Sequence, residues 1–161
     1  MKDNRLQKLL WVQSLILIGG TVFAWTKLLT QFDTFYSTYG TLFRFRDCVI
    51  PNPLATACFY GSLAFVVALV WSVVVLKIPT EIRARRLRNF LLFCVLFAGS
   101  VVSYEVADFY KLLPNGGIPI SCTPGANPLV TPCFYGMLFF IASFVTAIFA
   151  TRRLRTTISE V

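Results

Sequence analysis

The sequence predicts an all-α integral membrane protein, a bundle of four transmembrane helices built from two helix-loop-helix repeats. Hydrophobic residues make up 57% of the 161 residues and charged residues only 14%, whereas soluble domains carry roughly 45–50% and 25%. Four apolar segments approach the ~20 residues that cross a hydrocarbon core ~30 Å thick. In addition, a ten-residue block occurs twice, as NPLATACFYG at 52–61 and as NPLVTPCFYG at 127–136.

The first apolar segment runs from about Leu9 to Leu29 and follows a basic N-terminus. A signal peptide has the same arrangement, but this run is long for one and continues as FAWTKLL without a small-residue cleavage site. We therefore expect an uncleaved helix. The other three predicted helices span about Phe59 to Ile78, Asn89 to Tyr104 with an extension toward Ala107, and Phe134 to Ala150.

The segments between these helices are polar or rich in Pro and Gly, and in lipid they would leave backbone groups without partners. Two units result, residues 1–80 with an outer loop at about 30–57, and residues 81–161 with an outer loop at about 106–132. Together they form one membrane domain. Both units run in the same direction, so we interpret them as parallel repeats. We expect each outer loop to fold onto the mouth of the bundle, with a short interfacial helix.

Basic residues predict the orientation of the bundle. Eleven of the 15 Lys and Arg residues flank the helices on the side of the termini. The positive-inside rule makes that side cytoplasmic, so the cysteine-bearing loops are extracytoplasmic, most simply at a plasma (inner) membrane. The net charge of +8 is explained by contacts with anionic lipid headgroups rather than with nucleic acid. The remaining four basic residues are Lys27, Arg44, Arg46 and Lys111.

Composition excludes several classes of function. The chain contains no histidine, which excludes an imidazole base, an imidazole metal ligand and a histidine-ligated haem. The sequence has no P-loop, no metal-ligand cluster and no serine-histidine constellation. No acidic residue lies in the middle of a predicted helix, which argues against an ion-coupled transporter.

Four of the five cysteines lie in the predicted outer loops, Cys48 and Cys58 in the first and Cys122 and Cys133 in the second. They face the compartment in which disulfides persist. Pairing within each loop, as C-x9-C and C-x10-C, is the simplest arrangement, although four cysteines allow three connectivities. The fifth, Cys94, lies within the third helix, where we expect it to be inert packing.

The repeated CFYG sequence has two interpretations. In the first, the disulfides are structural staples, the Phe and Tyr residues form the aromatic belt of the membrane interface, and the glycine allows tight packing. In the second, the cysteines are redox-active. Cys58 and Cys133 both lie at the N-terminal end of a predicted helix, where the helix dipole stabilises a thiolate. There a sulfur could exchange with an outside thiol and also meet a lipid-soluble electron carrier.

This layout resembles the disulfide bond formation protein B family and the vitamin K epoxide reductase family. The resemblance implies a four-helix membrane bundle with two outer cysteine pairs and a reactive cysteine beside a bound quinone. Cys58 would take the helix-two position of the first family and Cys133 the helix-four position of the second, with Cys48 and Cys122 as their partners. Both families carry C-x-x-C at the quinone site, whereas here the spacings are longer.

The sequence thus leaves two functions open. One is a membrane thiol-disulfide oxidoreductase that takes electrons from a thioredoxin-like extracytoplasmic protein and passes them to a membrane quinone. The other is a non-enzymatic scaffold or accessory subunit that packs against other membrane subunits. For the enzyme, the candidate catalytic residues are Cys48, Cys58, Cys122 and Cys133. The candidate quinone contacts are Phe59, Tyr60, Phe134, Tyr135, Arg44 and Arg46.

Two further charged residues, Lys27 and Glu105, lie near the outer ends of helices one and three. We interpret them first as a snorkelling side chain or a structural ion pair. The alternative is that one of them lies beside a quinone or a substrate headgroup. Arg44 and Arg46 precede Cys48 closely enough to hold its thiolate, or they anchor the loop to lipid phosphates.

Overall fold

The structure is a computed structural model that describes residues 4–41, 52–112 and 127–159. It contains four long helices, in agreement with the all-α prediction. These are α1 (Asn4–Tyr39), α2 (Ala57–Lys77), α3 (Glu81–Phe109) and α4 (Pro132–Ser159). Two short 3-10 helices, η1 (Pro53–Ala55) and η2 (Pro128–Val130), lie directly before α2 and α4.

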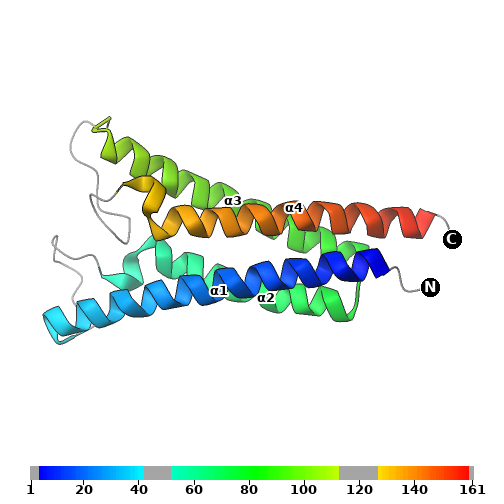
Figure 1. The fold of residues 1–161 in the computed structure, drawn as a ribbon, viewed down its shortest axis with the longest axis horizontal. Coiled ribbons are helices and arrows are strands. Elements are labelled where there is room, and N and C mark those ends of the chain that lie inside the picture. Colours follow the sequence, from blue (N-terminus) through cyan, green and yellow to red (C-terminus); the bar gives the residue numbers. More distant parts are fainter. Residues whose placement is uncertain (1–3, 42–51, 113–126, 160–161) are drawn as a thin grey trace.

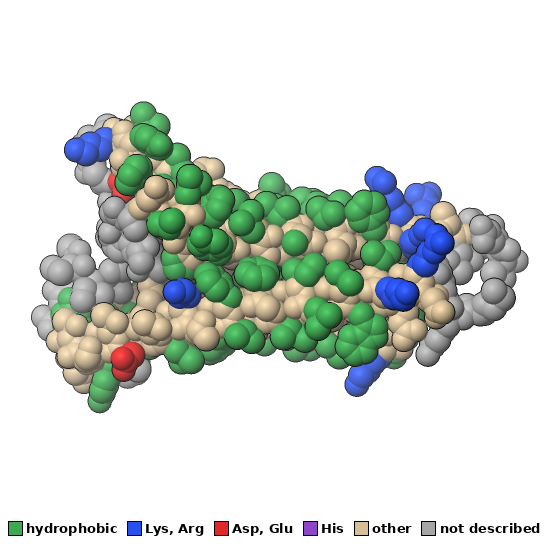
Figure 2. Space-filling model, viewed as in Figure 1, with side chains coloured by type: hydrophobic (Ala, Val, Ile, Leu, Met, Phe, Trp, Pro, Cys, Tyr) green, Lys and Arg blue, Asp and Glu red, His purple; other side chains and the backbone are tan. Residues whose placement is uncertain are grey.

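All four long helices are long and apolar enough to cross a membrane. Hydrophobic side chains cover the length of the face seen in Figure 2, while most Lys and Arg side chains gather at the end that carries the termini. Leu15, Val70 and Leu96 are among the large apolar side chains that point outward. In water such a surface would be costly, but lipid solvates it without penalty, and this supports a transmembrane bundle.

The helices form an antiparallel bundle with both termini at one end (Figure 1). Around the bundle, α1 packs against α2 and α4, and α3 packs against α4. The fourth seam, between α2 and α3, is the least extensive of the four. Toward the loop end α3 leans away from α1 (Figure 1).

At the loop end two helices extend further than the sequence suggested. We expected residues from about 30 onward to form a loop, but α1 continues to Tyr39 and α3 to Phe109. In α1 no Pro or Gly occurs after Gly20 until Gly40, which ends the helix with a φ of 64°, a conformation that suits glycine. At 36 residues, α1 is about 54 Å long at 1.5 Å per residue. Its last turns therefore project beyond a membrane core.

The repeated ten-residue block adopts the same local structure in both copies. Asn52 Oδ1 accepts a hydrogen bond from the Leu54 amide at 2.9 Å, and Asn127 Oδ1 accepts one from the Leu129 amide at 3.0 Å. Asn-Pro thus begins each 3-10 helix, as such turn sequences favour. The threonine that ends each one, Thr56 and Thr131, immediately precedes the long helix. The block therefore fixes where α2 and α4 begin. Most of each outer loop lies outside the described residues, so the interfacial helices that we expected there stay a prediction.

The centre of the bundle is built on Phe65 of α2. Its ring stacks on that of Phe140 in α4, with centroids 3.9 Å apart and an angle of 8° between the planes. On the other side Gly20 of α1 lets the Phe65 ring approach the backbone, since a Cβ at Gly20 would lie 2.5 Å from Phe65 Cε1. This small-residue contact brings α1 and α2 together, as is usual between helices in lipid.

The same contact gives a first testable expectation. Gly20→Val should destabilise the bundle by roughly 1–3 kcal/mol through overpacking, because Phe65 is held between α1 and Phe140 and cannot move aside. Gly99→Val is the matched control, since nothing lies within 4 Å of a Cβ built at Gly99. Thermal unfolding in detergent measures both. Equal melting temperatures for the two variants would contradict the close contact.

A hydrogen bond between hydroxyl groups also joins α1 and α2. Ser14 Oγ and Ser72 Oγ lie 2.9 Å apart, and both side chains are buried. Hydroxyl pairs of this kind hold helices together in lipid, where each contributes about 0.6 kcal/mol on average. Ser14 therefore has a structural partner in α2.

Candidate functional site

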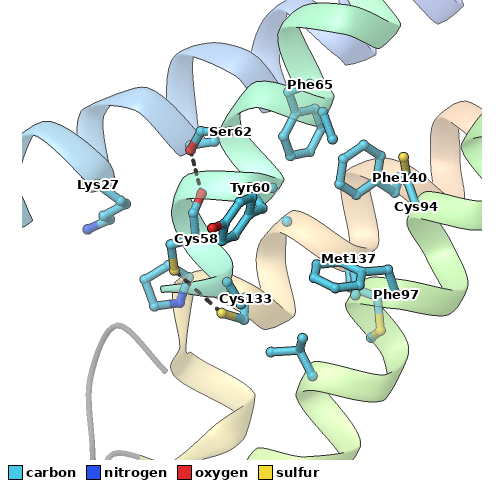
Figure 3. A pocket seen from close by; sticks show the side chains of 18 of the residues that line it. Lys27, Cys58, Tyr60, Ser62, Phe65, Cys94, Phe97, Cys133, Met137 and Phe140 are labelled. Atoms are coloured by element: carbon cyan, nitrogen blue, oxygen red, sulfur yellow. Dashed lines mark hydrogen bonds between the residues drawn. The ribbon is translucent and has the colours of Figure 1, made fainter. Parts of the chain in front are cut away.

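Cys58 and Cys133 meet at the loop end of the bundle. Each is the second residue of its helix, α2 and α4 respectively, and each is half-buried. Their sulfur atoms lie 3.5 Å apart, and Figure 3 shows the two side chains pointing toward each other. The sequence analysis placed the two cysteines at two equivalent mouths. The structure instead brings both sulfurs into one place, across the two halves of the chain.

The remaining cysteines complete this description. Cys58 is disulfide-bonded, and no disulfide joins two cysteines within the described ranges. Cys48 and Cys122, with Arg44 and Arg46, lie outside the described residues. The predicted pairings within the loops, and the predicted roles of the two arginines, therefore stay predictions.

A cavity of about 640 Å³ opens beside the two sulfurs. All four long helices contribute to its walls, and Cys58, Cys133 and Cys94 all line it. Its volume falls within the roughly 300–1,000 Å³ of small-molecule sites. The other lining residues are almost all apolar and include Phe23, Tyr60, Phe65, Phe90, Phe93, Phe97, Val101, Met137 and Phe140.

The glycines of the two CFYG sequences line the same cavity. A Cβ built at Gly61 has nothing within 4 Å, and one built at Gly136 meets only Phe65 Cε2, at 3.8 Å. The expectation that these glycines allow tight helix packing is therefore not met at Gly61. Cysteine and glycine are three residues apart in each copy, so both lie on one face of their helix. In each helix this face therefore carries the cysteine sulfur and, one turn further on, a glycine whose missing side chain leaves space in the cavity.

Of the four aromatic residues predicted to contact a quinone, only one lines the cavity. Tyr60 lines the cavity, whereas Phe59, Phe134 and Tyr135 are not among the lining residues. The Tyr135 ring packs edge-on against Phe23 of α1, with centroids 5.9 Å apart. It therefore helps to close the seam between α1 and α4.

Lys27 of α1 is a positively charged residue that lines the cavity. The contact between Gly20 and Phe65 fixes its height in the bundle, because α1 and α2 are antiparallel. Lys27 lies seven residues after Gly20 in α1, and Cys58 lies seven residues before Phe65 in α2. With an equal rise per residue, the two side chains start at the same level.

Glu105 of α3 is buried at the loop end, and its Oε2 accepts a hydrogen bond from the Thr131 hydroxyl at 2.9 Å. Thr131 Oγ1 in turn accepts a long hydrogen bond, at 3.4 Å, from the amide of Phe134 in the first turn of α4. Glu105 therefore supports the start of the helix that carries Cys133.

Sequence reasoning missed most of the cavity wall, in particular the phenylalanines at positions 65, 90, 93, 97 and 140. In a chain with 16 Phe residues, no one of them stands out. The available signal was the spacing Cys-x-x-Gly, which occurs in both copies of the block and marks the two walls nearest the sulfurs. Cys94, which we expected to be inert packing, is buried in the hydrophobic core and also lines the cavity.

No model of a known protein family matches the chain, and neither a curated protein nor a solved structure matches it at a significant level. The function is therefore argued from the geometry of the site.

Proposed function

We propose that the protein is a membrane thiol-disulfide oxidoreductase in which Cys58 and Cys133 pass electrons between the two loop cysteine pairs, with a membrane quinone as the final acceptor. The observation that carries this proposal is the separation of 3.5 Å between the two sulfurs. Reacting atoms in a productive arrangement lie roughly 3–3.5 Å apart. Structural staples within each loop, Cys48 with Cys58 and Cys122 with Cys133, would not by themselves explain why the Cys133 sulfur lies against the Cys58 sulfur.

The exchange begins at the second loop. A thiolate of the extracytoplasmic dithiol protein attacks the Cys122–Cys133 disulfide and forms a mixed disulfide with one of these cysteines. The partner's second thiolate then attacks the mixed disulfide, and the loop cysteine leaves as a thiolate. The partner leaves with a disulfide, and Cys122 and Cys133 are left reduced. Two electrons have thus moved from the partner to the protein, with no net change in the number of disulfides.

The two mouth cysteines carry the next step. The Cys133 thiolate attacks the sulfur of Cys58, a bond between Cys58 and Cys133 forms, and Cys48 leaves as a thiolate. Cys122 then attacks Cys133, which restores the Cys122–Cys133 disulfide and leaves Cys48 and Cys58 reduced. This direction follows from the disulfide-bonded state of Cys58, which makes Cys58 the electrophile of the pair.

The cavity beside the sulfurs suits a quinone, because its walls are apolar and Lys27 can donate a hydrogen bond to a ring oxygen. A quinone supplies an acceptor for two electrons and two protons, becomes a quinol, and so allows the Cys48–Cys58 disulfide to re-form. In this reaction the protein brings the cysteines to the acceptor, excludes water from the apolar cavity and offers a cation to the acceptor's oxygen.

The distribution of charge supports the orientation that this reaction needs. Basic residues at the terminal end, including Arg85, Arg86, Arg152 and Arg153, would lie on the cytoplasmic side of a plasma membrane. The loop end would then face the oxidising compartment, where a thioredoxin-like partner would reach the cysteines.

Reconstitution into vesicles containing a short-chain ubiquinone tests the proposal. With a reduced thioredoxin-fold protein as the donor, we expect quinone reduction to match the disulfide formed in the donor, mole for mole, and to continue for many turnovers. Vesicles without the protein give the background rate. A rate equal to that background, with loop disulfides that resist dithiothreitol until the protein unfolds, would favour the structural scaffold and overturn the enzyme.

A further inference from the structure

The opening of the cavity lies on the side of the bundle that faces lipid. Three large hydrophobic side chains line the cavity and are also exposed on the outer surface, namely Tyr60 of α2 and Phe93 and Phe97 of α3. The other exposed lining residues are Lys27 of α1 and Ala55 of η1. The three large side chains lie on either side of the seam between α2 and α3, which is the least extensive of the four seams. By contrast, the ring of Phe23 in α1 packs against the rings of both Tyr135 and Phe139 in α4 across the seam between these helices. The cavity is therefore closed on that side and open toward lipid between α2 and α3.

The cavity reaches inward from this opening to the sulfurs. In Figure 3, Tyr60 points into the space near Cys58, while Phe97 and Met137 lie on the side of Cys133. Gly61, where a Cβ would have nothing within 4 Å, is three residues from Cys58, and Gly136, where a Cβ would meet only Phe65 Cε2 at 3.8 Å, is three residues from Cys133. A ligand with a flat head and an apolar tail fits this shape, since its head can lie between the glycines while its tail passes between α2 and α3.

We propose that the cavity admits a lipid-soluble quinone sideways from the bilayer, through the seam between α2 and α3, and that Gly61 and Gly136 leave the space for its ring. Lys27, at the level of Cys58, supplies the cation that selects a head bearing oxygen over a plain hydrocarbon. The identity of the occupant rests on the proposed function, whereas the route and the space rest on the geometry of the cavity alone.

Binding can be measured without turnover. Trp71 packs against Phe90, with ring centroids 5.9 Å apart, and Phe90 lines the cavity. In a protein that carries Trp11→Phe, Trp25→Phe, Cys58→Ala and Cys133→Ala, Trp71 remains as the fluorophore and exchange between the mouth cysteines is absent. Quenching by decylubiquinone in detergent then reports occupancy of the cavity.

Gly61→Phe is the decisive variant, because its ring would fill the empty space beside Cys58. We expect the affinity for decylubiquinone to fall at least about tenfold, the loss that corresponds to 1.4 kcal/mol. Gly99→Phe is the matched control, since its Cβ also has open space but Gly99 does not line the cavity; its affinity should stay at the parent value. Lys27→Met should weaken decylubiquinone binding and leave the binding of a spin-labelled hydrocarbon chain of equal length unchanged.

The outcomes separate this inference from the proposed function. If Gly61→Phe fails to fold, Gly61→Val offers a smaller substitution with the same direction of effect. Quenching that is equal in the Gly61 and Gly99 variants would overturn the cavity as the site. Quinone binding that depends on Gly61, in a protein whose native form shows no turnover, would keep the inference and reject the enzyme. Turnover that is unaffected by Gly61→Phe would keep the enzyme and reject the inference.

Discussion

Cys133→Ala is expected to reduce quinone reduction by a dithiol donor to the rate of vesicles without protein. In the proposed relay Cys133 is both the sulfur that leaves when the donor attacks and the nucleophile that attacks Cys58. Without it neither the second-loop disulfide nor the bond across the mouth can form, so Cys58 loses the sulfur that lies 3.5 Å from its own. Steady-state quinone reduction, followed by absorbance, measures the effect.

Two further variants make this result specific. Cys58→Ala should also stop steady turnover, but its second loop keeps both cysteines, so it should still oxidise one equivalent of donor per protein. Leu15→Ala is the control, because Leu15 points outward and does not line the cavity, and it should retain turnover. Turnover by Cys133→Ala at more than about half the native rate would exclude the relay, whatever the behaviour of Cys58→Ala.

Phe65→Ala is expected to lower the free energy of unfolding by about 3 kcal/mol, near the lower end of the range for Phe in soluble cores. Phe65 is 2% exposed, stacks on Phe140 and fills the surface left open by Gly20. In lipid the transfer of apolar surface contributes little, so the loss comes mainly from dispersion contacts that a neighbouring side chain cannot replace.

Phe93→Ala provides the comparison for this variant. Phe93 is 64% exposed, so in a membrane lipid replaces most of what its ring contacts, and the loss should stay below about 1 kcal/mol. Equilibrium unfolding in mixed micelles of increasing denaturing detergent measures both variants. Similar losses for Phe65 and Phe93 would show that the Phe65 stack does not organise the bundle.

The sequence was sufficient to predict the helices but not how they meet. Apolar segments of membrane-spanning length predicted all four. The ends of α1 and α3 were placed too early, because a helix that leaves the membrane is stabilised by its own hydrogen bonds and continues until a residue such as Gly40 ends it.

The meeting of Cys58 and Cys133 could not be read from spacing. It depends on α2 and α4 approaching across the diagonal of the bundle at their first turns, and that approach is set by the Phe65–Phe140 stack more than 60 positions apart in the chain. The repeat offset of 75 residues made the two cysteines equivalent. It did not indicate that they are neighbours, nor that both glycines of CFYG border one shared cavity.

The most direct measurement is the formation of a disulfide between the two mouth cysteines. In a protein that carries Cys48→Ser and Cys122→Ser, mild oxidation in detergent should join Cys58 to Cys133 within a single chain, and peptide mass spectrometry should identify the linked peptides in nearly all molecules. Contact between the sulfurs at 3.5 Å predicts this bond without a cross-linker. Recovery of both cysteines as separately alkylated thiols after oxidation would contradict it, and with it the proposed passage of electrons across the mouth.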